Sequence, residues 1–266
     1  MKLAFIGGGN MGSAIIKAVI DKQIALADDI VVSDVDTSKL KNMAKELNVK
    51  TISNNVEAIC KAEVIILAIK PQILSKVLEE LKGQIANNQL VVSIIAGATI
   101  KTICKGLKHE NVVRVMPNTP AQIGKGMSAW TTTDAVTTAH RKMAEAILNA
   151  LGKQIYFEDE KYMDMATAIS GSGPAYIYLI IEALTDAAVH IGLPQQQAEE
   201  LVLQTVLGSA LFLQKSGKHP AELRNMVTSP GGTTAEGLFK LEKGKLRATI
   251  SKAVMASYKK AKQLGS

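Results

Sequence analysis

The sequence contains few of the residues that build metal sites, disulfides and aromatic stacking surfaces. Cys60 and Cys104 are its only cysteines, and neither they nor the 4 histidines stand at a metal-ligand spacing. We therefore expect no metal and no disulfide, and two plain thiols fit the reducing cytoplasm. Aromatic residues make up 4% of the chain. Such a low share argues against stacking platforms for single-stranded nucleic acid.

Long hydrophobic runs are also missing. Stretches such as residues 64–69 are far shorter than the roughly 20 residues that cross a bilayer, so we expect no membrane span. The chain enters an apolar run at Leu3 directly, without the pattern of a secretory signal. The 31 basic residues exceed the 24 acidic ones, which gives a net charge of +7, but they are dispersed. A dispersed charge indicates a solvated surface rather than a nucleic-acid partner.

The first 160 residues alternate short apolar runs with longer amphipathic stretches, which is typical of βαβ units. Most of the runs are apolar without alternation, as in parallel strands that are covered on both faces. We predict strands over residues 3–6, 30–33, 64–69, 90–95, 112–115, 127–131 and 154–157, and helices over residues 10–21, 38–47, 73–81 and 134–151. This pattern predicts a doubly wound, mostly parallel α/β sheet.

Beyond about residue 159 the strand signals disappear. Pro174 and Pro194 each open a helical stretch, Gly192 and Gly217 close them, and a last helix runs from residue 246 to the end. The acidic cluster at residues 158–160 marks the expected boundary. We predict a dinucleotide-binding domain over residues 1–159 and an all-helical domain over residues 160–266.

A glycine fingerprint follows the first predicted strand. Gly7, Gly9 and Gly12 are spaced as Gly-x-Gly-x-x-Gly, and Asp34 stands 22 residues after Gly12, at the end of the second predicted strand. This context predicts a Rossmann-type dinucleotide site, with the pyrophosphate at the helix N-terminus. A carboxylate at position 34 suits the ribose 2′-hydroxyl of NAD and would repel the extra phosphate of NADP. The alternative is that Asp34 only caps a turn.

Two further glycine-rich segments lie in the helical half, over residues 170–174 and 229–234. Each precedes a helical stretch, so each could offer backbone N–H groups and hydroxyls to a small carboxylate. The alternative for either segment is a simple N-capping turn.

Five motifs give the chain a specific resemblance, and they lie over residues 5–12, 68–71, 116–120, 170–176 and 220–242. Along its whole length the sequence resembles the pyrroline-5-carboxylate reductase family. The resemblance implies a Rossmann domain, an all-α C-terminal dimerisation domain, and a homodimer or a larger ring of dimers. It also implies reduction of Δ1-pyrroline-5-carboxylate to L-proline with NADPH or NADH, the last step of proline biosynthesis.

The resemblance also implies roles for individual residues. The pyrophosphate would be held by Gly7, Gly8, Gly9, Asn10, Met11 and Gly12. The adenosine ribose would be surrounded by Ser33, Asp34 and Asn55. The path toward the nicotinamide would be lined by Ala68, Ile69, Lys70, Pro71, Ile95, Ala96 and Gly97, with Asn118 nearby. The substrate would be held by Glu160, Ser229, Gly232, Thr233 and Thr234, and Thr234 is the candidate hydrogen-bond partner of the ring nitrogen.

Two other functions are compatible with the fingerprint. A β-hydroxyacid dehydrogenase would carry a catalytic Lys on the helix after its second glycine-rich segment, and residues 174–179 contain none. A non-catalytic NAD(P)-binding redox sensor would not need the intact segment over residues 229–234. The pair Asp34-Val35 also departs from family members that prefer NADP, which makes NADH use plausible.

Overall fold

The computed structural model describes residues 1–265, which form two compact units. The first, here called the sheet unit, comprises Met1–Ser172 together with the chain from Ser257 onward. The second, the helical unit, comprises Gly173–Ala256. The sheet unit thus extends past the boundary predicted after residue 159. The helix that it gains there, α7 (Lys161–Ala166), is fixed to the sheet by ion pairs that are described below.

The sheet unit is built on an 8-stranded sheet with the order β3-β2-β1-β4-β5-β6-β7-β8. Its first six strands follow the Rossmann order, and every neighbouring pair is parallel except β6 with β7. The predicted fold class is therefore confirmed. The strands are β1 (Leu3–Ile6), β2 (Ile30–Ser33), β3 (Lys50–Ile52), β4 (Val64–Leu67), β5 (Leu90–Ser93), β6 (Val112–Met116), β7 (Gly126–Thr132) and β8 (Gly152–Tyr156).

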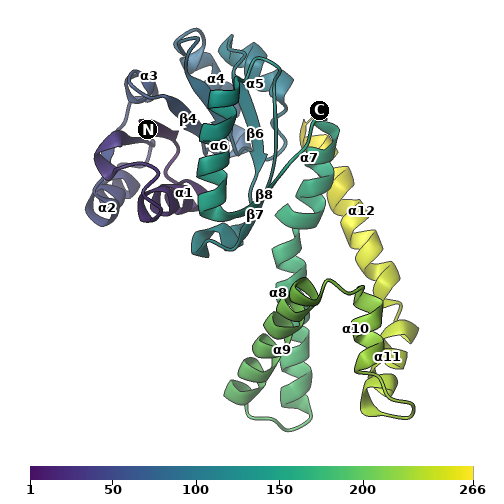
Figure 1. The fold of residues 1–266 in the computed structure, drawn as a ribbon. Helices are drawn as coiled ribbons and strands as arrows, with labels where there is room; N and C mark the ends of the chain where they lie inside the picture. Colours follow the sequence, from purple (N-terminus) through teal and green to yellow (C-terminus); the bar gives the residue numbers. More distant parts are fainter. Residues whose placement is uncertain (266) are drawn as a thin grey trace. The chain divides into compact units, whose positions relative to one another are not determined.

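Helices cover the sheet on both faces (Figure 1). Successive strand residues point to opposite faces, so Leu3 and Phe5 of β1 join one core cluster while Ala4 and Ile6 join the other. The first cluster includes residues of α1 (Asn10–Asp21), α2 (Thr37–Leu47) and α6 (Thr138–Leu151). The second includes residues of α3 (Asn55–Ile59), α4 (Leu74–Leu81) and α5 (Ile100–Leu107). The core therefore lies in two layers, one on each face of the sheet.

The helical unit begins with two long helices, α8 (Gly173–His190) and α9 (Gln195–Ser216), which pack against each other. Pro194 caps the start of α9, and Gly217 ends it with a left-handed backbone at φ +64°. Two shorter helices follow, α10 (Pro220–Met226) and α11 (Thr233–Lys243), and the unit contains the first part of α12 (Leu246–Gly265). Within residues 1–265, no helix combines the length and apolarity that a bilayer crossing requires.

Candidate functional site

The loop between β1 and α1 carries the glycine fingerprint, and the structure explains two of its glycines by packing. Gly7 has φ +104°, and a Cβ built there would lie 2.5 Å from the carbonyl oxygen of Ala68. A Cβ on Gly12 would lie 2.6 Å from the carbonyl oxygen of Gly7. Both positions need glycine for the fold itself, because a side chain would push α1 away from the sheet.

Gly9 is different, because nothing in the protein requires a glycine there. Its φ and ψ of −74° and −177° suit any residue, and no atom lies within 4 Å of a Cβ built on it. Gly9 is the N-cap of α1 and has no side chain to accept from the first-turn N–H groups, which begin with Asn10 and Met11. The open space therefore suits a close approach of a phosphate to the backbone, as in a dinucleotide-binding loop.

Gly9→Ala is therefore expected to weaken NADH and NADPH binding about tenfold, roughly 1.4 kcal/mol, with an unchanged melting temperature. The added methyl group meets no protein atom and occupies only the space left for the ligand. Nucleotide fluorescence titration and thermal unfolding measure the two effects. Gly12→Ala is the contrasting variant, because its clash with Gly7 lowers stability as well as binding. An unaltered dissociation constant in Gly9→Ala would exclude this loop as the phosphate site.

At the end of β2, Asp34 is fixed by the glycine loop. Its Oδ2 accepts a hydrogen bond from the backbone N–H of Gly8 at 2.7 Å, and its Oδ1 accepts one from that of Asp36 at 2.9 Å. Beside it, the Ser33 hydroxyl donates to Asn55 Oδ1 at 2.7 Å. The structure thus brings Gly8, Ser33, Asp34 and Asn55 together at one end of the sheet, where a Rossmann fold binds the adenosine ribose. The half-buried Asp34 is more than a turn cap, because it links β2 to the phosphate loop.

The residues predicted along the nicotinamide path follow β4 and β5. Ala68 continues from β4 and donates its N–H to Ile6 at 2.8 Å, while Lys70 and Pro71 are exposed at the start of a short 3₁₀ turn. After β5, the side chain of Ile95 is buried in the core at 2% exposure, so only its backbone can face a ligand. Gly97 has φ +77°, and a Cβ on it would lie 2.7 Å from Leu264 near the end of α12. Ala96 lies between these two positions and is partly exposed.

Asn118 has an internal role that its motif does not reveal. Its Nδ2 donates to the carbonyl oxygen of Ser170 at 3.0 Å, and its Oδ1 accepts from the N–H of Met127 at 2.8 Å. The side chain therefore fastens the loop after β6 to two other segments. Contact with a nicotinamide stays a prediction for this residue.

The prediction of an open, anion-binding turn over residues 170–174 is wrong. Thr167–Gly171 form a π-helical turn, which continues from α7 (Lys161–Ala166) and leads into α8. The N–H of Ser172 donates to Thr167 at 2.8 Å, and the Ser170 hydroxyl donates to Ala166 at 2.9 Å. The Ser172 hydroxyl pairs with the Ser257 hydroxyl of α12 at 2.9 Å, so these donors already have partners within the protein. Gly171 serves packing, because it lies against Met116.

Glu160 lies in an ion-pair cluster centred on Arg114, a residue that the sequence analysis missed. Glu160 Oε1 accepts from Arg114 Nη1 at 2.7 Å and from the N–H of Ile100 at 2.8 Å. Arg114 Nη2 also donates to Asp164 Oδ1 at 2.9 Å, and its side chain is only 5% exposed. The signal for it was a lone arginine inside the apolar strand at 112–116. These pairs join α7 to β6, which is why the sheet unit includes α7.

Apart from Glu160, the residues predicted to hold the substrate lie in the helical unit, where a tight turn precedes α11. The N–H of Gly232 donates to the carbonyl oxygen of Ser229 at 3.0 Å, and Gly231 has φ +66°. Gly232 is the N-cap of α11, without a side-chain cap, and Thr233 and Thr234 form its first turn. The N–H groups of this turn have no intrahelical acceptor and carry the positive end of the helix dipole. They can hold a carboxylate.

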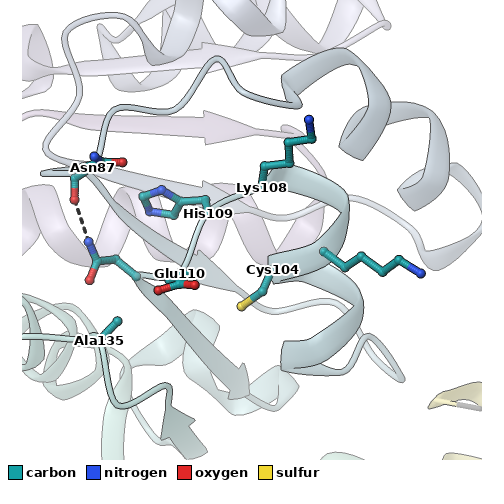
Figure 2. Close-up of a pocket in the computed structure, with 8 residues that line it drawn as sticks. Asn87, Cys104, Lys108, His109, Glu110 and Ala135 are labelled. Carbon is teal, nitrogen blue, oxygen red and sulfur yellow. Dashed lines mark hydrogen bonds between the residues drawn. The ribbon is translucent and has the colours of Figure 1, made fainter.

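A polar cavity of about 750 Å³ lies in the sheet unit, near the start of β6 (Figure 2). Cys104, Glu110 and His109 line it, and the His109 Nε2 lies 2.9 Å from the carbonyl oxygen of Gln89. Burial raises the pKa of the Cys104 thiol, and it lowers the pKa of His109. A thiol with a raised pKa is a poor nucleophile, so Cys104 is not activated in this cavity. Across residues 1–265, no three His, Cys, Asp or Glu side chains gather in a way that could hold a metal ion.

Family models match both halves of the chain. A family model described as pyrroline-5-carboxylate reductase dimerisation matches residues 160–264, and one described as NADP oxidoreductase coenzyme F420-dependent matches residues 2–97. The chain is 41% identical to a pyrroline-5-carboxylate reductase of Synechocystis over 100% of this chain and 98% of that relative. It is 38% identical to one from Arabidopsis thaliana over 99% and 95% of the two chains.

Two solved structures of similar proteins match the whole chain. The crystal structure of a Plasmodium falciparum pyrroline carboxylate reductase with NADP bound matches with a TM-score of 0.92 and 36% identity, covering 100% of this chain and 98% of that one. A pyrroline-5-carboxylate reductase from Coxiella burnetii matches with a TM-score of 0.91 and 37% identity, again over 100% and 98%.

Proposed function

This chain belongs to the pyrroline-5-carboxylate reductase family, and we propose that it reduces the C=N bond of Δ1-pyrroline-5-carboxylate to give L-proline, the last step of proline biosynthesis. The hydride would come from NADPH or NADH. The observation that carries the proposal is the open backbone at Gly9, which nothing in the protein itself explains. We propose the functional division after residue 159, with the dinucleotide held by residues 1–159 and the substrate clamp and dimer contacts supplied by residues 160–266.

The reduction depends more on how the substrate is positioned relative to the hydride donor than on acid–base catalysis. The bound nicotinamide supplies the hydride, and the chain's own residues hold the substrate in line with it. Glu160 stays a predicted contact of the substrate. Because the N–H of Gly232 donates to Ser229 within the turn, we propose that the N–H groups of Thr233 and Thr234, with the Ser229 hydroxyl beside them, hold the substrate carboxylate. This carboxylate is remote from the reacting bond, so its binding energy is converted into alignment of the ring.

We propose that the Thr234 hydroxyl forms a hydrogen bond with the ring nitrogen. A hydroxyl can donate or accept, which suits a nitrogen that gains a proton during the reaction. No histidine lies near the start of α11 in the sequence, and His219 instead caps α10 by accepting from the N–H of Ala221 at 3.2 Å.

We also propose a homodimer, with assembly of dimers into a larger ring. The helices α8 and α9 bury only Thr185 and Ala198, while large apolar side chains such as Leu179, Leu207 and Phe212 are 64%, 49% and 55% exposed. So much apolar surface on adjacent helices needs a covering partner. The dimerisation model that matches residues 160–264 supports a second copy of this chain as that partner. We propose that the protein is located in the cytoplasm, where the free thiols of Cys60 and Cys104 stay reduced.

A paired assay tests the proposal. Addition of pyrroline-5-carboxylate to the protein with NADH, and separately with NADPH, is expected to cause a fall in nicotinamide absorbance and the formation of L-proline. Reactions without the imine are the control. Oxidation of neither nucleotide would contradict the proposed reaction and would favour a non-catalytic NAD(P)-binding redox sensor. Turnover of a β-hydroxyacid instead would favour the related dehydrogenase, although residues 174–179 provide no lysine for that chemistry.

A further inference from the structure

We propose that Glu80 is a further determinant of nucleotide specificity, which acts through Asn55 to disfavour the 2′-phosphate of NADPH. The inference rests on the proposed nucleotide site at the end of β2. It concerns a residue on α4 that belongs to none of the motifs described above.

The observation is a chain of hydrogen bonds that leads from β2 to α4. The Ser33 hydroxyl donates to Asn55 Oδ1 at 2.7 Å, and Asn55 Nδ2 donates to Glu80 Oε2 at 2.9 Å. Because a carboxylate only accepts, the contact with Glu80 fixes the Asn55 amide with its Nδ2 toward Glu80 and its Oδ1 toward Ser33. The chain therefore fixes the Glu80 carboxylate one side chain away from Ser33, next to the position where a Rossmann fold binds the ribose.

The Glu80 side chain is exposed on α4. Among residues 1–265, no Lys, Arg or His nitrogen lies within salt-bridge distance of its carboxylate. Its neighbour Glu79 instead pairs with Lys82 at 3.2 Å. An unpaired carboxylate is the stronger source of negative potential, because a paired one is partly compensated by its partner.

The surroundings add to this potential. Asp34 follows Ser33 directly in the sequence, and Asp36 lies two residues further on. The cation of Lys39 is paired with Asp36 at 3.6 Å. A ribose 2′-phosphate, with a charge of about −1.5 to −2, would be repelled by the carboxylates of Asp34 and Glu80. A neutral 2′-hydroxyl is not repelled, so the arrangement favours NADH.

Glu80 offers a cleaner test than Asp34. Asp34 accepts from the backbone of Gly8, so its replacement disturbs the phosphate loop and affects the binding of both nucleotides. Glu80→Gln keeps an oxygen that can accept from Asn55 and removes only the charge. Glu79→Gln is the matched control, because it removes an equal charge from the adjacent position of the same helix.

The experiment measures dissociation constants of NADH and NADPH by nucleotide fluorescence, without substrate, for the full chain and each variant. We expect Glu80→Gln to bind NADPH about three- to tenfold more tightly at low ionic strength, with a smaller change for NADH. The gain should shrink in 0.5 M salt, where the Debye length falls to about 4 Å. Asp34→Ser is the positive comparison and is expected to shift the same ratio.

An unchanged ratio of the two constants in Glu80→Gln would overturn the inference. An equal change for both nucleotides would also overturn it, because it would indicate a structural role. A similar shift in Glu79→Gln would show a diffuse effect of net charge, with the same consequence. Since no turnover is measured, failure of the reductase assay leaves these outcomes distinct: nucleotide discrimination can be present in a protein that does not reduce the imine.

Discussion

Replacing Arg114 with Met is expected to lower the free energy of unfolding by about 3 kcal/mol, near the lower end of the cost of breaking a buried ion pair. The guanidinium is 5% exposed and pairs with both Glu160 and Asp164. Without it, the carboxylates of Glu160 and Asp164 remain close together in a partly buried position and have no positive charge beside them. Their own side chains are 32% and 21% exposed, so water compensates some of the loss. Urea unfolding measures the effect.

Two further variants separate the ion pairs from the loss of a large side chain. Arg247→Met removes a surface partner of Glu242, where the side chains are 68% and 51% exposed, and we expect a loss below about 1 kcal/mol. Adding Glu160→Gln and Asp164→Asn to Arg114→Met should recover much of the stability, because no uncompensated charge remains. An Arg114→Met protein as stable as the parent would show that the cluster does not hold α7 on the sheet.

The same cluster reaches the proposed nicotinamide path. Glu160 accepts from the N–H of Ile100, the first residue of α5, and the loop before it contains Ile95, Ala96 and Gly97. Arg114 therefore holds Glu160 in a position that also fixes this loop. The arrangement couples the boundary helix α7 to the end of β5, two segments that are far apart in the sequence.

Most strands of the sheet could be predicted because their apolar runs are continuous. The predictions for residues 3–6 and 30–33 agree with the bounds of β1 and β2. The strand β3 was missed because Lys50–Ile52 is three residues long and lies at the sheet edge, where its residues are exposed or half-buried. The helix α5 was also missed, since it has only 8 residues and the β-branched Ile100, Thr102 and Ile103 favour helices weakly.

The candidate site could be predicted where residues close together in the sequence form a motif. It could not be predicted where it depends on contacts between residues that are far apart in the sequence. The spacing of Gly7, Gly9 and Gly12 predicts a phosphate loop, and packing within that loop explains the glycines at positions 7 and 12. No local pattern shows that Arg114 pairs with Asp164, 50 residues later in the chain. The glycines at 171 and 173 misled for the same reason, since a π-helical turn needs its tertiary neighbours before it can be distinguished from a loop.

Thr234→Ala is expected to lower kcat about 100-fold while NADH binding stays unchanged, because a positioned hydrogen-bond partner of the reacting nitrogen contributes on that order. The variant should fold normally. Thr234 lies in the first turn of α11, where alanine is a better helix former, and it caps no other backbone group of that helix. Steady-state kinetics with pyrroline-5-carboxylate, together with fluorescence titration of NADH, measure the two quantities.

Thr234→Ser gives the decisive comparison, because serine restores the hydroxyl without the methyl group. If the hydroxyl holds or protonates the ring nitrogen, Thr234→Ser should recover kcat to within about tenfold of the parent. If the residue only shapes the turn before α11, serine and alanine should behave alike. Steady-state constants of Thr234→Ala equal to those of the parent would remove this hydroxyl from the reaction, and the backbone N–H groups of Thr233 and residue 234 would remain as the proposed anchor for the substrate carboxylate.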